Sequence, residues 1–180
     1  MKLPALGQDQ ICLGVALEVP EPLASRIQQA RSAFMDQDAH LPPHITLLPP
    51  LACDLTDLPA VKAHLASIVQ PQRPFRVHLH STASFRPVSP TVFLALEQGA
   101  AQCVALEAAL RTGPLACRTG FDFHPHVTVA HQVDEATLNR AKAAMASFDE
   151  TFVASEVDLW QLQLDGTVTH LERYQMEGRA

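Results

Sequence analysis

Residues 40–50 of the chain read HLPPHITLLPP, a short apolar run bracketed by prolines in which the polar members are His44 and Thr46. Prolines disfavour a helix here and instead bound a strand. Side chains at positions i and i+2 of a strand point to the same face. His44 and Thr46 are therefore expected to share one face of a strand, while Ile45 and Leu47 point into the core.

The same arrangement returns at residues 124–131, HPHVTVAH, where His126 and Thr128 again follow a proline. A single H-x-T is a weak signal, and His80-Ser81-Thr82 is an isolated match without the proline or the apolar strand. The longer pattern P-H-[IV]-T-[LV] occurs twice, at matching places in the chain. This repetition predicts that both strands have a functional face.

The elements around the two motifs follow the same order, which indicates an internal duplication. Each half is expected to be β-α-β-α-β, with halves at approximately 9–86 and 90–176 in one bilobal domain over 1–180. We therefore predict an α+β fold with two pseudo-twofold-related halves around a central cleft. The expected strands are 11–19, the two motif strands, 75–85, 91–98 and 152–164, the last followed by a hairpin at Asp165-Gly166. The expected helices are 21–35, 56–69, 100–112 and 134–148, the last capped by Asp134.

Composition limits the class of protein. Apolar residues make up 47% and charged residues 18% of the 180 residues, a globular balance. The net charge of −6 argues against coating long stretches of nucleic acid, but it allows a small nucleotide or one terminal phosphate as partner. Neither a secretory signal nor a membrane-length apolar run is evident, so the sequence predicts a cytoplasmic protein without membrane contact. The four cysteines show no C-x-x-C pair and are expected to be free thiols.

Two imidazoles that meet across a cleft suit attack on a phosphodiester. One neutral imidazole can take a proton from the nucleophile, and one imidazolium can give a proton to the leaving oxygen. Threonine hydroxyls can donate to the non-bridging oxygens, where charge is spread in the transition state. We predict His44, Thr46, His126 and Thr128 as the catalytic set, with no metal and no cofactor required.

With these motifs in duplicated halves, the chain resembles the 2H phosphoesterase superfamily, and within it the bacterial 2′-5′ RNA ligase and RNA 2′,3′-cyclic phosphodiesterase branch. The resemblance implies metal-independent chemistry on a nucleotide or RNA terminus that carries a cyclic phosphate or a 2′-5′ linkage. It also implies that His44 and His126 form the acid–base pair, with Thr46 and Thr128 as phosphate donors. The resemblance leaves open which histidine is the acid. It also leaves open whether the protein hydrolyses or cleaves its substrate or catalyses the reverse ligation.

The second motif departs from many members of that branch, which continue it to an arginine where this chain has His131. A histidine provides a titrating, single-point phosphate contact instead of a permanent bidentate one. His131, Arg86 and Phe123 are the candidate substrate-binding residues, Arg118 is a second possible clamp, and Phe121 is expected in the core.

Two alternatives compete with the enzyme interpretation. His124, His126 and His131 offer imidazoles for a zinc site, although no cysteine pair or H-E-x-x-H completes a ligand set. The chain could instead be a non-catalytic nucleotide- or RNA-binding module that keeps the fold.

Overall fold

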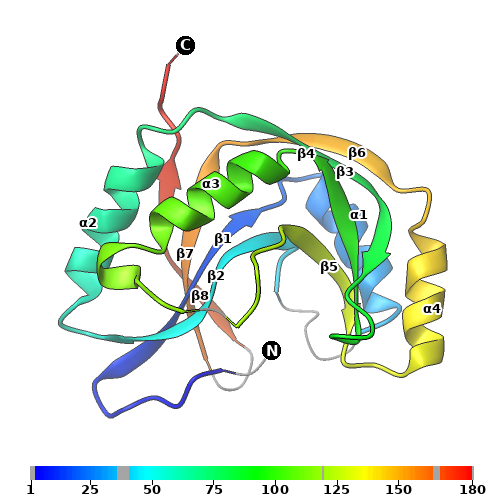
Figure 1. Ribbon diagram of the computed structural model, residues 1–180, viewed down its shortest axis with the longest axis horizontal. Coiled ribbons are helices and arrows are strands. Elements are labelled where there is room, and N and C mark those ends of the chain that lie inside the picture. Colours follow the sequence, from blue (N-terminus) through cyan, green and yellow to red (C-terminus); the bar gives the residue numbers. More distant parts are fainter. Residues whose placement is uncertain (1–2, 36–40, 119, 164–166, 180) are drawn as a thin grey trace.

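A computed structural model describes residues 3–35, 41–118, 120–163 and 167–179. In this part of the chain eight strands form one antiparallel sheet, and helices cover one of its faces (Figure 1). The strands are β1 (Gln10–Glu18), β2 (His44–Asp54), β3 (Phe75–Ser84), β4 (Thr91–Gln98), β5 (His126–His131), β6 (Asp149–Ala154), β7 (Glu156–Leu162) and β8 (Val168–Gln175). The helices are α1 (Leu23–Ser32), α2 (Leu58–Val69), α3 (Ala100–Leu110), α4 (Glu135–Ala144) and the short 3-10 helix Gly113–Leu115. The predicted α+β class is confirmed.

The order of the strands divides the sheet into two lobes. The order is β6-β3-β4-β5-β2-β1-β7-β8, and among the described residues one residue pair, Ile45↔Val127, joins β5 to β2. We call β2, β1, β7 and β8 the first lobe, and β5, β4, β3 and β6 the second lobe. Helices α2 and α3 pack against the first lobe, and α1 and α4 against the second (Figure 1).

The lobes do not coincide with the two halves of the sequence. Strand β3 belongs to the first half but pairs with β4 of the second lobe, and β7 belongs to the second half but pairs with β1. The first half thus contributes β3 to the second lobe, and the second half contributes β7 and β8 to the first. The assignment of 9–86 and 90–176 as halves of a single domain stays a prediction, and the strand order shows that such halves interlock.

The strand predicted over 152–164 is wrong in one respect, because the structure has two strands there, β6 and β7, separated at Ser155. The Ser155 carbonyl accepts a hydrogen bond from the Met176 amide at 2.8 Å, which continues the pairing of β7 with β8 and not that of β6 with β3. Strand β6 pairs with β3 at one edge of the sheet, and β7 pairs with β1 near the other. The chain therefore runs directly from one lobe to the other at this point (Figure 1). The predicted hairpin turn at Asp165-Gly166 lies outside the described residues, although the flanking strands β7 and β8 do pair antiparallel.

The apolar pattern of β1 explains why this strand is packed on both faces. Alternate residues of the strands, such as Leu13, Val15 and Leu17, belong to the main aliphatic core under the helices. On the opposite face of β1, Cys12 and Ala16 pack with Trp160 and Leu162 in a second, smaller cluster. Strand β1 is therefore buried on both faces, which is typical of a continuous apolar run.

Helix α4 begins as predicted, because the Asp134 side chain accepts hydrogen bonds from the Thr137 amide at 2.8 Å and from its hydroxyl at 2.9 Å. In the described residues no helix is long and apolar enough to cross a membrane. All four cysteines are free, and Cys12, Cys53 and Cys103 are buried.

Candidate active site

The two motif strands alternate as the sequence predicts. In β2, Ile45 and Leu47 are 0% and 1% exposed, whereas His44 and Thr46 are half-buried. In β5, Val127 and Val129 are fully buried, whereas His126 and Thr128 are half-buried. Each strand therefore turns its aliphatic side chains to the helix-covered core and its imidazole and hydroxyl to the opposite face of the sheet.

The seam between the lobes brings the two pairs together. Ile45 and Val127 are register partners in antiparallel strands. Continued by one residue to each side, this register sets His44 opposite Thr128 and Thr46 opposite His126. Directly opposed and diagonal side chains of an antiparallel pair lie about 5 and about 7–8 Å apart at their Cβ atoms. The four side chains thus occupy one patch of the sheet, with the pseudo-twofold axis between Ile45 and Val127.

Both imidazoles are held by the same backbone contact. Nδ1 of His44 lies 2.7 Å from the Pro42 carbonyl, and Nδ1 of His126 lies 2.7 Å from the His124 carbonyl. A carbonyl can only accept, so each Nδ1 carries the proton and each ring presents Nε2 to chemistry. In the first lobe, Nε2 of His44 lies 3.1 Å from the Thr46 hydroxyl.

Around His44 the neighbours are an indole and ionised groups. The Trp160 ring meets the His44 ring edge-on, with centroids 4.9 Å apart, and its Nε1 donates to Glu18 at 3.2 Å. Glu18 is the register partner of His44, and burial, followed by repulsion from Asp158, raises its pKa. Arg173 joins the two carboxylates, because its Nε donates to Asp158 at 2.7 Å and its Nη2 lies 3.3 Å from Glu18.

Around His126 the neighbours are aromatic. The rings of Phe85 and Phe93 lie 4.9 and 5.1 Å from the His126 ring, centroid to centroid. Burial lowers the pKa of His126, an effect partly opposed by its hydrogen bond to the His124 carbonyl. His126 is therefore held in the neutral form near pH 7, with Nε2 free of a proton and able to accept one.

A β-bulge brings His131 to the same face. By simple alternation, residue 131 faces away from residues 126 and 128. However, Phe93 pairs with Thr128 while Thr91 pairs with His131, so one extra residue of β5 lies between the two pairs. Because Thr91 and Phe93 share a face of β4, His131 returns to the face of Thr128, at the far end of the strand from His126.

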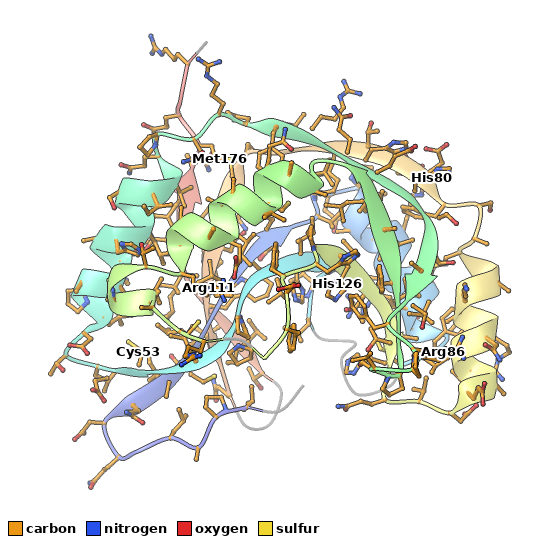
Figure 2. All side chains as sticks on the ribbon, in the orientation of Figure 1. Cys53, His80, Arg86, Arg111, His126 and Met176 are labelled. Atoms are coloured by element: carbon orange, nitrogen blue, oxygen red, sulfur yellow. The ribbon has the colours of Figure 1, made fainter. Side chains whose placement is uncertain are left out.

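The other candidate binding residues lie elsewhere. Arg86 donates to the Asn139 side chain at 2.9 Å and lies 3.7 Å from Glu135, so its guanidinium ties the end of β3 to α4; Figure 2 shows it beside that helix. Phe123 is partly buried and packs against the main core. Phe121, expected in the core, is 78% exposed, so that expectation is wrong: its segment precedes β5 as an irregular loop rather than a strand. Arg118 is exposed in the same loop.

Sequence reasoning missed the side chains that support the two imidazoles. Trp160, Phe93 and the pair Asp158–Arg173 come from strands far from the motifs in the chain, and their contacts depend on the strand order. In the described part of the chain, the imidazoles of His124, His126 and His131 do not come together as a zinc site. The ligand atoms of a different histidine group do lie close together.

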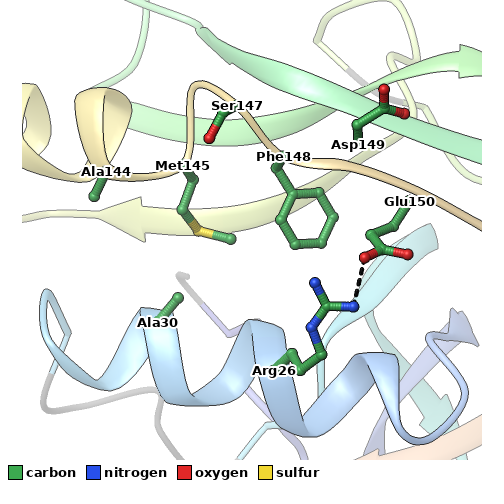
Figure 3. A pocket seen from close by; sticks show the side chains of 8 residues that line it. All are labelled: Arg26, Ala30, Ala144, Met145, Ser147, Phe148, Asp149 and Glu150. Carbon is green, nitrogen blue, oxygen red and sulfur yellow. Dashed lines mark hydrogen bonds and ion pairs between the residues drawn. The ribbon is translucent and has the colours of Figure 1, made fainter.

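One further pocket lies away from the paired motifs. It has a volume of about 330 Å³ and lies between α1 and the segment that joins α4 to β6 (Figure 3). Arg26 and Glu150 form an ion pair across it. None of the four motif residues lines it, so it is separate from the candidate active site.

Comparison with known proteins agrees with this architecture. A sequence profile of the 2′-5′ RNA ligase superfamily matches residues 19–166. A relative from Halalkalibacterium halodurans, which carries the provisional name of a phosphoesterase, is 26% identical over 165 residues, 91% of this chain and 96% of its own length.

Solved structures show the same fold. Escherichia coli LigT complexed with 3′-AMP superposes with a TM-score of 0.70 at 20% identity, over 93% of this chain and 98% of LigT. A protein of Thermus thermophilus gives a TM-score of 0.70 at 22% identity, over 94% and 100% of the two chains. Other LigT structures contain NADP+ and ATP.

The chain therefore belongs to the 2′-5′ RNA ligase superfamily, as its two motifs predicted. Within that superfamily it groups with relatives that are named as phosphoesterases.

Proposed function

We propose that this protein opens 2′,3′-cyclic phosphates of nucleotides or RNA ends by acid–base catalysis with two histidines. The observation that carries the proposal is the register pair Ile45↔Val127. With this register the two His–Thr pairs are neighbours on the same face of the sheet. The LigT complexes with 3′-AMP, NADP+ and ATP support a nucleotide as the class of ligand.

The surroundings of the two imidazoles support a different role for each. His126 is the base, since burial lowers its pKa and leaves Nε2 unprotonated. It takes a proton from a water molecule as the water oxygen bonds to phosphorus. The bond from phosphorus to one ribose oxygen breaks, and His44, protonated on Nε2, gives that oxygen its proton. The register neighbour Glu18 stabilises the imidazolium of His44.

The remaining groups bind the phosphate. Thr46 and Thr128 donate to the non-bridging oxygens as negative charge develops there. His131, on the same face at the far end of β5, supplies a further contact to the substrate. Both proton transfers are assigned to imidazoles, so no step is assigned to a metal ion. In ligation a 5′-hydroxyl would replace water as the nucleophile: its oxygen bonds to phosphorus, the bond from phosphorus to the 3′ oxygen breaks, and the same two imidazoles accept and donate the protons, which leaves a 2′-5′ linkage.

Single-turnover hydrolysis of a nucleoside 2′,3′-cyclic phosphate tests the proposal. His44→Asn and His126→Asn should each lower the rate by about 10²–10⁴-fold. His124→Asn is the matched control, because it replaces an exposed imidazole two residues from His126. Equal slow rates for wild type and both variants, with nucleotide binding retained, would favour the non-catalytic binding module instead.

A further inference from the structure

A second histidine group lies on the second lobe, outside the candidate active site. It comprises His78 and His80 on β3, Glu97 on β4 and Asp149 on β6. One ligand atom from each of His78, His80 and Glu97 falls within 4.8 Å of the others. We propose that this group, the β3–β4–β6 cluster, binds a divalent transition-metal ion of the zinc class.

The backbone aims these side chains at one point. His78 and His80 alternate with Leu79, which is fully buried, so both imidazoles project from the face of the sheet opposite the core. His78 pairs with Gln98 while Leu79 pairs with Leu96, so Glu97 is the extra residue of a β-bulge. Such bulges redirect a side chain, and this one brings the Glu97 carboxylate 3.0 Å from Nδ1 of His78.

Asp149 completes the cluster from the edge strand. It is the register partner of His80, and its carboxylate lies 2.6 Å from Nε2 of His78 and 3.8 Å from Nδ1 of His80. Figure 3 shows the alternation of β6, with Glu150 directed to Arg26 in the pocket and the Asp149 carboxylate directed away from it.

The contacts of His78 resemble those of a metal-bound imidazole. A ligating histidine typically binds the ion through one nitrogen and donates its other N–H to a carboxylate, which fixes the ring. Here Nε2 of His78 donates to Asp149 while Nδ1 faces Glu97, and the centroid of the His80 ring lies 5.6 Å from that of His78. The geometry thus makes His78, His80 and Glu97 the ligands and Asp149 the group that orients His78, with water in the fourth position.

The donor set selects the class of ion. Two imidazole nitrogens and a carboxylate oxygen suit zinc and its neighbours, whereas magnesium and calcium prefer oxygen alone. Ligand atoms around tetrahedral zinc stand about 3.4 Å apart, given bonds of about 2.0–2.1 Å. The ligand atoms must approach one another by at most about 1.4 Å, from separations within 4.8 Å. The side chains allow this movement because that of His78 is 23% exposed and that of Glu97 is 63% exposed.

The cluster is separate from the reaction described above. His80 pairs with Ala95, and Ala95 pairs with His126, so two strand spacings, about 10 Å, separate the backbones that carry the two imidazoles. An ion in the cluster does not reach the phosphate between His44 and His126. The test of metal binding can therefore fail while the test of hydrolysis succeeds, and the reverse is also possible.

Isothermal titration calorimetry of the chelator-treated chain with zinc chloride tests the proposal. We expect one ion per chain. His80→Asn should abolish this binding, and Asp149→Asn should weaken it by about 10–100-fold. His64→Asn, on α2 outside the cluster, should bind as the wild type does.

Circular dichroism of each variant shows whether it is folded. Wild-type protein with no saturable 1:1 binding up to about 1 mM zinc would overturn the proposal, as would a folded His80→Asn variant with wild-type affinity. Hydrolysis of the cyclic phosphate by His80→Asn should equal that of the wild type, because the residue lies outside the proposed catalytic group.

Discussion

The two motif copies are held alike and surrounded differently. Each imidazole donates Nδ1–H to the carbonyl two residues before it. Yet His44 lies against an indole and beside Glu18, while His126 lies against two phenylalanine rings that pack on each other. The motif therefore determines how the ring is oriented, and the neighbouring strands determine what surrounds it. A duplicated motif can in this way provide both an acid and a base.

The largest expected effect separates these two roles. His126→Asn should slow hydrolysis by about 10²–10⁴-fold whether the leaving group is a ribose oxygen or p-nitrophenolate, because both reactions need the base. His44→Asn should show the same loss only with the ribose leaving group, since p-nitrophenolate leaves without a proton. Single-turnover rates with a cyclic phosphate and with a p-nitrophenyl phosphodiester give the comparison.

The opposite pattern would reverse the assignment. If His126→Asn, and not His44→Asn, is rescued by the better leaving group, then His126 is the acid. The His124→Asn variant should match the wild type with both substrates.

The side chains around the two imidazoles should contribute differently to the free energy of unfolding. Phe93 is 2% exposed beside His126, and Phe93→Ala should lower the free energy of unfolding by about 3–5 kcal/mol through the cavity it leaves. Asp158 is 1% exposed, but its partners Arg173 and His170 reach solvent, so Asp158→Asn should cost about 1–3 kcal/mol. Denaturant unfolding measures both. A larger loss for Asp158→Asn would show that ionic contacts dominate the first lobe.

The aromatic contact also predicts a pH effect. The base must be neutral, so kcat/KM should fall as the pH drops through the pKa of His126, which burial holds below its usual 6.5. Phe85→Ala exposes the ring to water and should raise that pKa, which moves the acidic limb of the profile to higher pH.

NMR titration of His126 checks this shift directly, and Phe121→Ala provides the control because that side chain is 78% exposed and precedes the motif strand. An unchanged His126 titration in Phe85→Ala would show that Phe85 has no part in the low pKa.

The smallest effect concerns one helix of each lobe. Asp134 caps α4 through Thr137, whereas Asp57 precedes α2 without a side-chain capping bond. Asp134→Ala should therefore lower Tm more than Asp57→Ala does. The hydrogen bonds to Thr137 lower the pKa of Asp134, so this stabilisation is present above the unfolded-state pKa and is lost as the pH falls through the folded-state pKa.

Thermal unfolding at neutral and at acidic pH measures the difference. Asp134→Asn should retain much of the cap, since asparagine is also a good N-cap residue. Equal Tm losses for Asp134→Ala and Asp57→Ala at neutral pH would contradict the capping argument.

Local patterns in the sequence were sufficient to predict most of the elements and which side chains of the two motif strands share a face. Proline brackets and alternation located the strands of His44 and His126, and Asp134 marked the start of α4. These features depend on neighbours within a few residues, which is where propensity and periodicity are informative.

The remaining features depend on contacts between distant segments. Strand β3 pairs in the second lobe and β7 in the first. This pairing depends on which edges of the sheet are free as the chain folds, and no short sequence pattern encodes it. The bulge that turns His131 to the active face also could not be read from alternation, which places the residue on the other side. For the same reason Trp160 and Phe93 were missed as neighbours of the imidazoles.

The path of the chain through Ser155 has a mechanical consequence. The lobes pair at Ile45 and Val127, and the backbone also crosses from one to the other between β2 and β3 and again where β6 passes directly into β7. Several connections restrain a hinge more than one does, because rotation about one would stretch the others. The spacing of the two motif imidazoles is therefore built into the folded backbone, so the proposed reaction would start from groups that are already aligned.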